Sequence, residues 1–121
     1  MGAVNLYAGK HILVVEDDYF IAQQLVDWLE QIGAVVVGPA PSVNRALTLA
    51  SGETIIDAAV LDINLNGDMA FPVADLLLSR GVPFVFATGY DDKDIPARYD
   101  SVPRLSKPVE AGDLQDALFR R

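Results

Sequence analysis

The chain has 121 residues, no cysteine and a formal net charge of −8, with 51% hydrophobic and 21% charged residues. This length and composition are typical of one globular domain, and the lack of cysteine excludes disulfides, thiolate catalysis and zinc–thiolate sites. The acidic balance argues against a nucleic-acid partner, and no apolar run approaches the roughly 18 residues that a membrane span requires.

Short apolar runs alternate with stretches of helical periodicity along the chain. Pro103 interrupts the last of these runs, which suits a strand at the edge of a sheet. Because the runs are apolar and alternate with helices over short links, we expect an α/β fold: a doubly wound, five-stranded parallel sheet with helices on both faces. The five predicted strands lie at 12–15, 34–37, within 55–61, at 84–87 and at 102–105.

Helix boundaries are indicated by capping residues and by proline. Asp18 and Ser42 each precede a stretch of helical spacing and are predicted N-caps. Met69 is expected to begin the apolar side of the third helix, in which Pro72 falls early. The final helix is predicted at residues 110–120.

The ends of the chain give two further expectations. Residues 1–10 lack the charged and then apolar pattern of a signal peptide, and we expect them to form an N-terminal tail of a cytoplasmic protein. No internal repeat, low-complexity tract or linker interrupts the rest, so we expect one domain at 11–121.

Polar residues follow four of the predicted strands. Glu16 and Asp17 follow the first, Asp62 the third, Thr88 the fourth and Lys107 the last. The carboxyl ends of parallel strands share one edge of the sheet, where α/β proteins bind their ligands. Neighbouring carboxylates repel each other unless a cation lies between them, and Mg²⁺ prefers oxygen ligands. The pattern therefore predicts a magnesium site with Asp62 as a nucleophile toward a phosphoryl group, whose oxygens Lys107 and Thr88 bind.

Asn64 lies two residues beyond Asp62, where its backbone carbonyl is placed to complete the metal shell. Each of the strand-end residues also has an ordinary structural interpretation, as part of a capping pair, as a turn residue or as a structural salt bridge. Their joint occurrence in this order at strand ends favours the phosphoryl site.

Four motifs together closely resemble the receiver domain of bacterial two-component response regulators, over nearly the whole chain. The resemblance implies the flavodoxin-like receiver fold, and because family members carry a cis peptide before the proline of the last motif, Lys107–Pro108 is expected to be cis. The motifs are I-L-V-V-E-D-D (12–18), V-L-D-I-N-L-N-G (60–67), F-A-T-G-Y (86–90) and L-S-K-P (105–108).

The resemblance also implies a role for each site residue. It makes Asp62 the phosphoacceptor and Asp17 a direct ligand of Mg²⁺. Glu16 would act on the metal through water, and the backbone carbonyl of Asn64 would be a further ligand. The two residues that bind the phosphoryl group would be Thr88 and Lys107.

Two features resemble the FAT GUY subgroup of receivers. The run F-A-T-G-Y is similar to the subgroup signature, which usually has another residue between the glycine and the tyrosine. Arg104 stands three residues before the lysine, where ordinary receivers carry an aromatic residue. We therefore expect a switch formed by Thr88, Tyr90 and Arg104. We also expect the segment 89–101, with at most a short helix from about residue 96, to be weakly packed and to become ordered on phosphorylation.

The function that this resemblance implies is a phosphoryl-accepting domain of a two-component phosphorelay, phosphorylated on Asp62 with Mg²⁺. Its partners would be a sensor histidine kinase or phosphotransfer protein and a downstream protein. It would act as a stand-alone relay, a phosphate sink or a protein-binding switch, and not as an enzyme beyond self-phosphorylation and slow autodephosphorylation.

Two alternatives remain. A Mg²⁺-dependent phosphohydrolase of the haloacid dehalogenase type also uses an aspartate nucleophile, but it normally needs a second aspartate where this chain has Asn64. An unphosphorylated receiver that serves only as an interaction scaffold is the other alternative, and the complete set of site residues argues against it.

Overall fold

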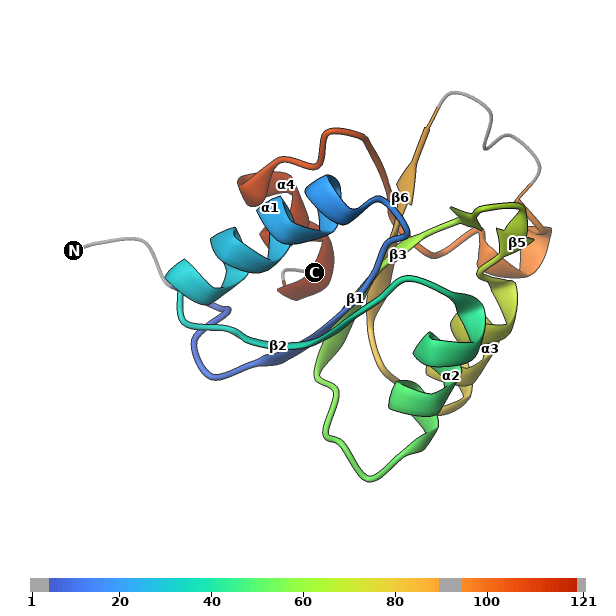
Figure 1. Cartoon of the computed structure of the whole chain (residues 1–121), viewed down its shortest axis with the longest axis horizontal. Coiled ribbons are helices and arrows are strands. Elements are labelled where there is room, and N and C mark those ends of the chain that lie inside the picture. Colours follow the sequence, from blue (N-terminus) through green and yellow to red (C-terminus); the bar gives the residue numbers. More distant parts are fainter. Residues whose placement is uncertain (1–4, 90–94, 120–121) are drawn as a thin grey trace.

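Figure 1 shows the computed structural model of the chain, which describes residues 5–89 and 95–119. The strands of its main sheet are β1 (His11–Val15), β2 (Val35–Ala40), β3 (Ala58–Asp62), β6 (Phe84–Thr88) and β7 (Arg104–Ser106). They pair in parallel in the order β2-β1-β3-β6-β7. The α-helices are α1 (Tyr19–Gln31), α2 (Val43–Ser51), α3 (Phe71–Ser79) and α4 (Ala111–Phe119).

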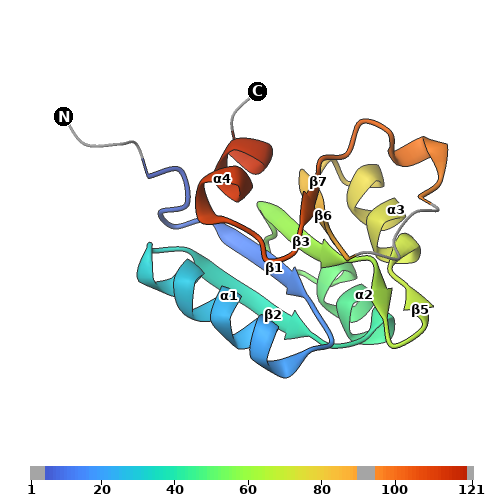
Figure 2. The ribbon, with the colours of Figure 1, turned by 90° about the horizontal axis from the view of Figure 1, so that it is seen from above.

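Helices cover both faces of the sheet, as Figure 2 shows. One apolar core joins the sheet to α2 and α3, and a second joins it to α1 and α4. β3 lies in the middle of the strand order and every one of its residues is buried. A strand buried on both faces has no polar alternation, which is why this one reads as a continuous apolar run that ends in an aspartate. The predicted doubly wound α/β fold is confirmed.

The helix starts follow the predicted caps. The Asp18 side chain accepts hydrogen bonds from the backbone N–H groups of Phe20 and Ile21 at the start of α1. The Ser42 hydroxyl oxygen accepts one from the N–H of Arg45 at the start of α2. These caps pair backbone donors that have no partner within the helix, and they fix the point at which the chain leaves β1 and β2.

A small hairpin separates β3 from α3. It consists of β4 (Asn64–Leu65) and β5 (Asp68–Met69), which pair antiparallel. Its two turn residues both have positive φ, 54° for Asn66 and 96° for Gly67, the conformation for which an Asn-Gly pair is suited. The expectation that Met69 begins the helical apolar side is therefore wrong, because the turn reverses the chain and α3 begins two residues later.

The short helix expected from about residue 96 is confirmed as the 3₁₀ helix η1 (Ala97–Tyr99). The last strand differs from the prediction, since β7 begins at Arg104 and not at residue 102. Pro103 has no N–H to donate to a ladder, although its carbonyl accepts a hydrogen bond from the N–H of Phe86 at 3.0 Å.

Part of the segment that we expected to be a tail packs against the domain. Tyr7 is 1% exposed, and its ring lies edge-on to those of Trp28 and Phe119. The Asn5 side-chain amide also donates to the carbonyl of Ile32 at 2.7 Å. Across residues 5–89 and 95–119, none of the helices has the length and apolarity needed to cross a membrane.

Candidate functional site

The carboxyl edge of the sheet brings three of the predicted site residues together. Asp62 is the last residue of β3 and is 5% exposed, and Glu16 directly follows β1 and is 6% exposed. Thr88 ends β6, one residue past Ala87, which is the register partner of Asp62. Parallel pairing of β1, β3 and β6 thus places these side chains at one end of the fold, as the sequence predicted.

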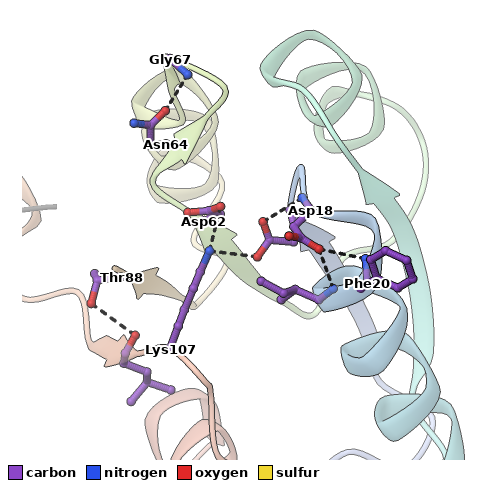
Figure 3. Close-up of polar contacts among 10 residues, drawn as sticks. Asp18, Phe20, Asp62, Asn64, Gly67, Thr88 and Lys107 are labelled. Atoms are coloured by element: carbon purple, nitrogen blue, oxygen red, sulfur yellow. Dashed lines mark hydrogen bonds and ion pairs between the residues drawn. The ribbon is translucent and has the colours of Figure 1, made fainter. Parts of the chain in front are cut away.

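Lys107 reaches into this edge from the segment that follows β7 (Figure 3). Its Nζ lies 3.0 Å from Glu16 Oε1 and 2.9 Å from Asp62 Oδ2. Its backbone N–H donates to the Thr88 carbonyl at 3.0 Å, and the Lys107–Pro108 peptide is cis, as predicted. Burial alone lowers the pKa of this ammonium, but the two carboxylates outweigh burial and raise that pKa above its ordinary value.

Glu16 is the carboxyl group that this environment perturbs most clearly. Burial and then the neighbouring Asp62 raise the pKa of Glu16 to about 7, although Lys107 and the N–H of Asp18, 3.2 Å from Oε2, act in the opposite direction. Burial thus outweighs the effect of the Lys107 ammonium on the pKa of Glu16. A further cation would favour the ionised form of Glu16.

An acidic cluster capable of holding such a cation is present. Glu16, Asp17 and Asp62 each offer one carboxylate oxygen, and these three atoms lie within 4.8 Å of one another. The donors are all carboxylate oxygens, which suits a hard divalent cation such as Mg²⁺ better than a soft metal.

The side chains of Thr88 and Asn64 both make hydrogen bonds outside this acidic cluster. The Thr88 hydroxyl donates to the Leu105 carbonyl on β7 at 3.4 Å, a long and therefore weak hydrogen bond. The Asn64 side-chain oxygen accepts from the N–H of Gly67 at 2.7 Å and closes the hairpin (Figure 3). The Asn64 side chain is thus used within the hairpin, and only its backbone carbonyl remains a predicted ligand.

Of the predicted switch residues, Arg104 lies on β7, while Tyr90 lies outside the described residues. Arg104 pairs in register with Phe86 of β6. One of its guanidinium nitrogens, Nη2, donates to the Tyr99 carbonyl at 3.5 Å and lies 3.8 Å from an Asp100 carboxylate oxygen. Arg104 therefore places a cation against the end of η1.

Tyr99 is an anchor that the sequence analysis missed. It is fully buried, stacks on Phe71 with ring centroids 5.4 Å apart, and donates its hydroxyl to the Asp75 carboxylate of α3. Arg98 completes the contact through an ion pair with Asp75 at 3.0 Å. The expectation of weak packing is therefore wrong for Tyr99, whereas residues 97, 98, 100 and 101 are exposed. A lone tyrosine in an irregular segment gave no periodic signal from which its burial was predictable.

Comparisons with known proteins give two informative relatives. The chain is 41% identical to SdrG from Sphingomonas melonis Fr1 and matches its solution structure with a TM-score of 0.77, over 91% of this chain and 93% of that one. The BeF3-activated conformation of SdrG from Pseudomonas melonis Fr1 matches with a TM-score of 0.71 at 41% identity, over 93% and 96% of the two chains. No protein-family model matches.

The second relative is the phyllosphere-induced regulator PhyR of Methylorubrum extorquens. It is 30% identical over 115 residues, which are 89% of this chain and 43% of PhyR, so the chain spans less than half of that regulator. The response regulator REC domain of PhyR from Erythrobacter litoralis, at 23% identity, has the same fold, with a TM-score of 0.71 over 91% of this chain and 87% of that one.

Proposed function

The chain belongs to the receiver domains of response regulators, and from this premise we propose that it accepts a phosphoryl group on Asp62 within a two-component phosphorelay. The observation that carries the proposal is the position of the Asp62 carboxylate. It is buried at the end of the central strand, 2.9 Å from the Lys107 ammonium and beside two further carboxylates. A buried, charge-paired carboxylate at this edge is placed for chemistry at a ligand site.

The acidic cluster fits Mg²⁺, since it offers three carboxylates within 4.8 Å of one another. In the proposed site Asp17 and Asp62 bind the metal directly, Glu16 acts through water, and the Asn64 carbonyl is a further ligand. When bound, Mg²⁺ would neutralise charge on the phosphoryl oxygens and on the cluster.

In the proposed step a carboxylate oxygen of Asp62 forms a bond to phosphorus while the bond between phosphorus and the donor's imidazole nitrogen breaks. The products are an aspartyl phosphate and a free histidine on the donor. Lys107 replaces one of its two carboxylate contacts with a charge-assisted contact to a phosphoryl oxygen. The Thr88 hydroxyl gives up only its 3.4 Å hydrogen bond to Leu105 when it turns to the phosphoryl group.

The remaining parts of the proposal follow from this chemistry. The receiver domain spans 11–121. Its phosphodonor is a sensor histidine kinase or a phosphotransfer protein. Because the kinase uses ATP, which is cytoplasmic, the proposed location of the chain is the cytoplasm. The domain acts in one of three ways: as a relay, as a phosphate sink or as a protein-binding switch of the FAT GUY type. A switch of this type has a downstream protein as its partner.

A phosphohydrolase is less well supported. It would use a second carboxylate two residues after the nucleophile, and that position holds Asn64, whose side chain bonds to Gly67 of the hairpin. Within the described residues, this position therefore offers no acid to protonate a leaving group.

Intact-mass analysis after incubation with acetyl phosphate and Mg²⁺ tests the proposal. We expect the mass of one added phosphoryl group, lost in Asp62→Asn and on removal of Mg²⁺ with EDTA. Asp57→Asn is the matched control, because Asp57 lies just before the other end of β3 and binds the N–H of His11 at 2.7 Å. Absence of any added mass in the wild type would support the scaffold, and turnover of phosphomonoesters would support the phosphohydrolase.

A further inference from the structure

A cavity adjoins the proposed phosphorylation site on the side of α1. Its volume is about 520 Å³, within the range of pockets that hold small organic ligands. Glu16, Asp62 and Lys107 line one part of it, so the cavity and the acidic cluster are continuous. The phosphoryl chemistry proposed above uses these three residues but not the rest of the cavity.

The remainder of the lining is mostly apolar. Ile21, Leu25 and Trp28 come from consecutive turns of α1, and Val109 comes from the segment that leads into α4. The Trp28 ring packs edge-on against the ring of Tyr7, with the ring centroids 5.2 Å apart. A cavity with such walls favours a ligand that has an aromatic or aliphatic part.

The charges around the cavity favour a cationic ligand. Glu110, an exposed residue, adds a third carboxylate to those of Glu16 and Asp62, while Lys107 is the one cation in the lining. That ammonium is already paired with Glu16 and Asp62 at 3.0 and 2.9 Å. A ligand with an ammonium group thus complements the acidic side of the cavity.

We propose that this cavity binds a small amphipathic amine, with its apolar part against Leu25 and Trp28 and its ammonium toward Glu110 and the acidic cluster. Such a ligand lies where the proposed Mg²⁺ would bind, so the two compete. This competition rests on the proposed function, whereas the binding of the amine does not. The amine would therefore inhibit phosphorylation of Asp62.

Trp28 is the only tryptophan of the chain, so its fluorescence reports on the cavity directly. We would titrate the metal-free protein with 2-phenylethylamine and, as a neutral analogue of similar size, with 2-phenylethanol. The amine is expected to change the fluorescence saturably and to bind about tenfold more tightly than the alcohol, since the ion pairs with the acidic side of the cavity are lost with the charge. Equal affinity for the two compounds would overturn the proposal.

Variants locate the binding. Val109→Phe fills the cavity and is expected to abolish the fluorescence change, whereas Val35→Phe makes the same substitution at an exposed position of β2 and serves as the control. Glu110→Gln is expected to weaken amine binding by about three- to fivefold, the effect of one exposed ion pair. Unchanged affinity in folded Val109→Phe overturns the proposal. If that variant fails to fold, unchanged affinity in Glu110→Gln overturns it.

Two titrations separate this proposal from the metal site. Mg²⁺ binding is first measured without amine, and its absence would contradict the proposed function alone, because the metal-free amine titration still tests the cavity. Where Mg²⁺ binds, increasing its concentration is expected to raise the apparent Kd of the amine in proportion. An amine affinity that Mg²⁺ leaves unchanged would overturn the proposed competition and leave the metal site intact.

Discussion

At the scale of single residues, the site is a cluster of three carboxylates, two of which contact one ammonium. Lys107 contacts both Glu16 and Asp62, so it occupies part of the space that a bound cation would share. Burial and then the neighbouring Asp62 raise the pKa of Glu16 even though this ammonium acts in the opposite direction. The residue types and their strand-end positions were predictable from the sequence. The double contact of Lys107 was not, because it joins positions that are about ninety residues apart in the chain.

Asp17 is predicted to be the carboxylate on which metal binding depends most, because it is the member of the cluster that makes no ion pair with Lys107. We expect Asp17→Asn to weaken Mg²⁺ binding by at least about tenfold, measured by calorimetry. Asp18→Asn is the matched control, since asparagine also caps a helix and α1 is retained. Equal Mg²⁺ affinity in the two variants would contradict the assignment of Asp17.

Asp75 gives a pH-dependent prediction away from the site. Hydrogen bonds from Arg98 and then Tyr99 lower the pKa of Asp75 below its ordinary value of 3.8. A lowered carboxyl pKa contributes stability that is present above the ordinary pKa and is lost as the pH falls through the folded-state pKa. We therefore expect Asp75→Asn to be less stable than the wild type at pH 7 in urea unfolding, with a difference that shrinks below about pH 4. A difference that is constant with pH would contradict this account.

At the scale of elements, two short irregular pieces shape the surroundings of the site. The β4–β5 hairpin follows Asp62 directly, and η1 lies between β6 and β7. The Asn66–Gly67 turn was predictable from its residues, but the strands on either side, of two residues each, carry too little pattern to be recognised. The inner strands β1, β3 and β6 were predictable because burial on both faces leaves uninterrupted apolar runs.

η1 shows where sequence patterns fail. Helical periodicity has no meaning over three residues, so the burial of Tyr99 depends on contacts with α3 and β6 that are distant in the chain. The hydroxyl donates to Asp75, and the ring packs between Phe71 and Phe86. η1 is thus fixed to α3, and Arg104 of β7 contacts it through the carbonyl of Tyr99.

Tyr99→Phe tests this anchor. The substitution keeps the ring and removes the hydrogen bonds to Asp75 and Phe71, so we expect it to lower the free energy of unfolding by about 1 kcal/mol. Tyr19→Phe is the control, because Tyr19 is 72% exposed and its loss of a hydroxyl should leave stability unchanged. Equal stability of both variants and the wild type, measured by urea unfolding at pH 7, would show that the tyrosine hydroxyl does not hold η1.

At the scale of the whole molecule, the parallel sheet gives the domain two different ends. The amino-terminal ends of β1 and β3 are joined by His11 and Asp57, an ordinary pair of polar residues 3.5 Å apart. The carboxyl ends gather the acidic cluster, Lys107 and Thr88. The strands of the main sheet all point toward the site because they pair in parallel, and the short segments that follow them supply the chemistry.

The central claim is that Asp62 carries the phosphoryl group, and reduction of the phosphorylated protein tests it most directly. Borohydride converts an aspartyl phosphate into homoserine, which peptide mass spectrometry locates in the sequence. After treatment with acetyl phosphate and Mg²⁺, the account predicts homoserine at position 62 and at no other aspartate. Homoserine at Asp17 or Asp57, or none at all in a protein that binds Mg²⁺, would contradict it.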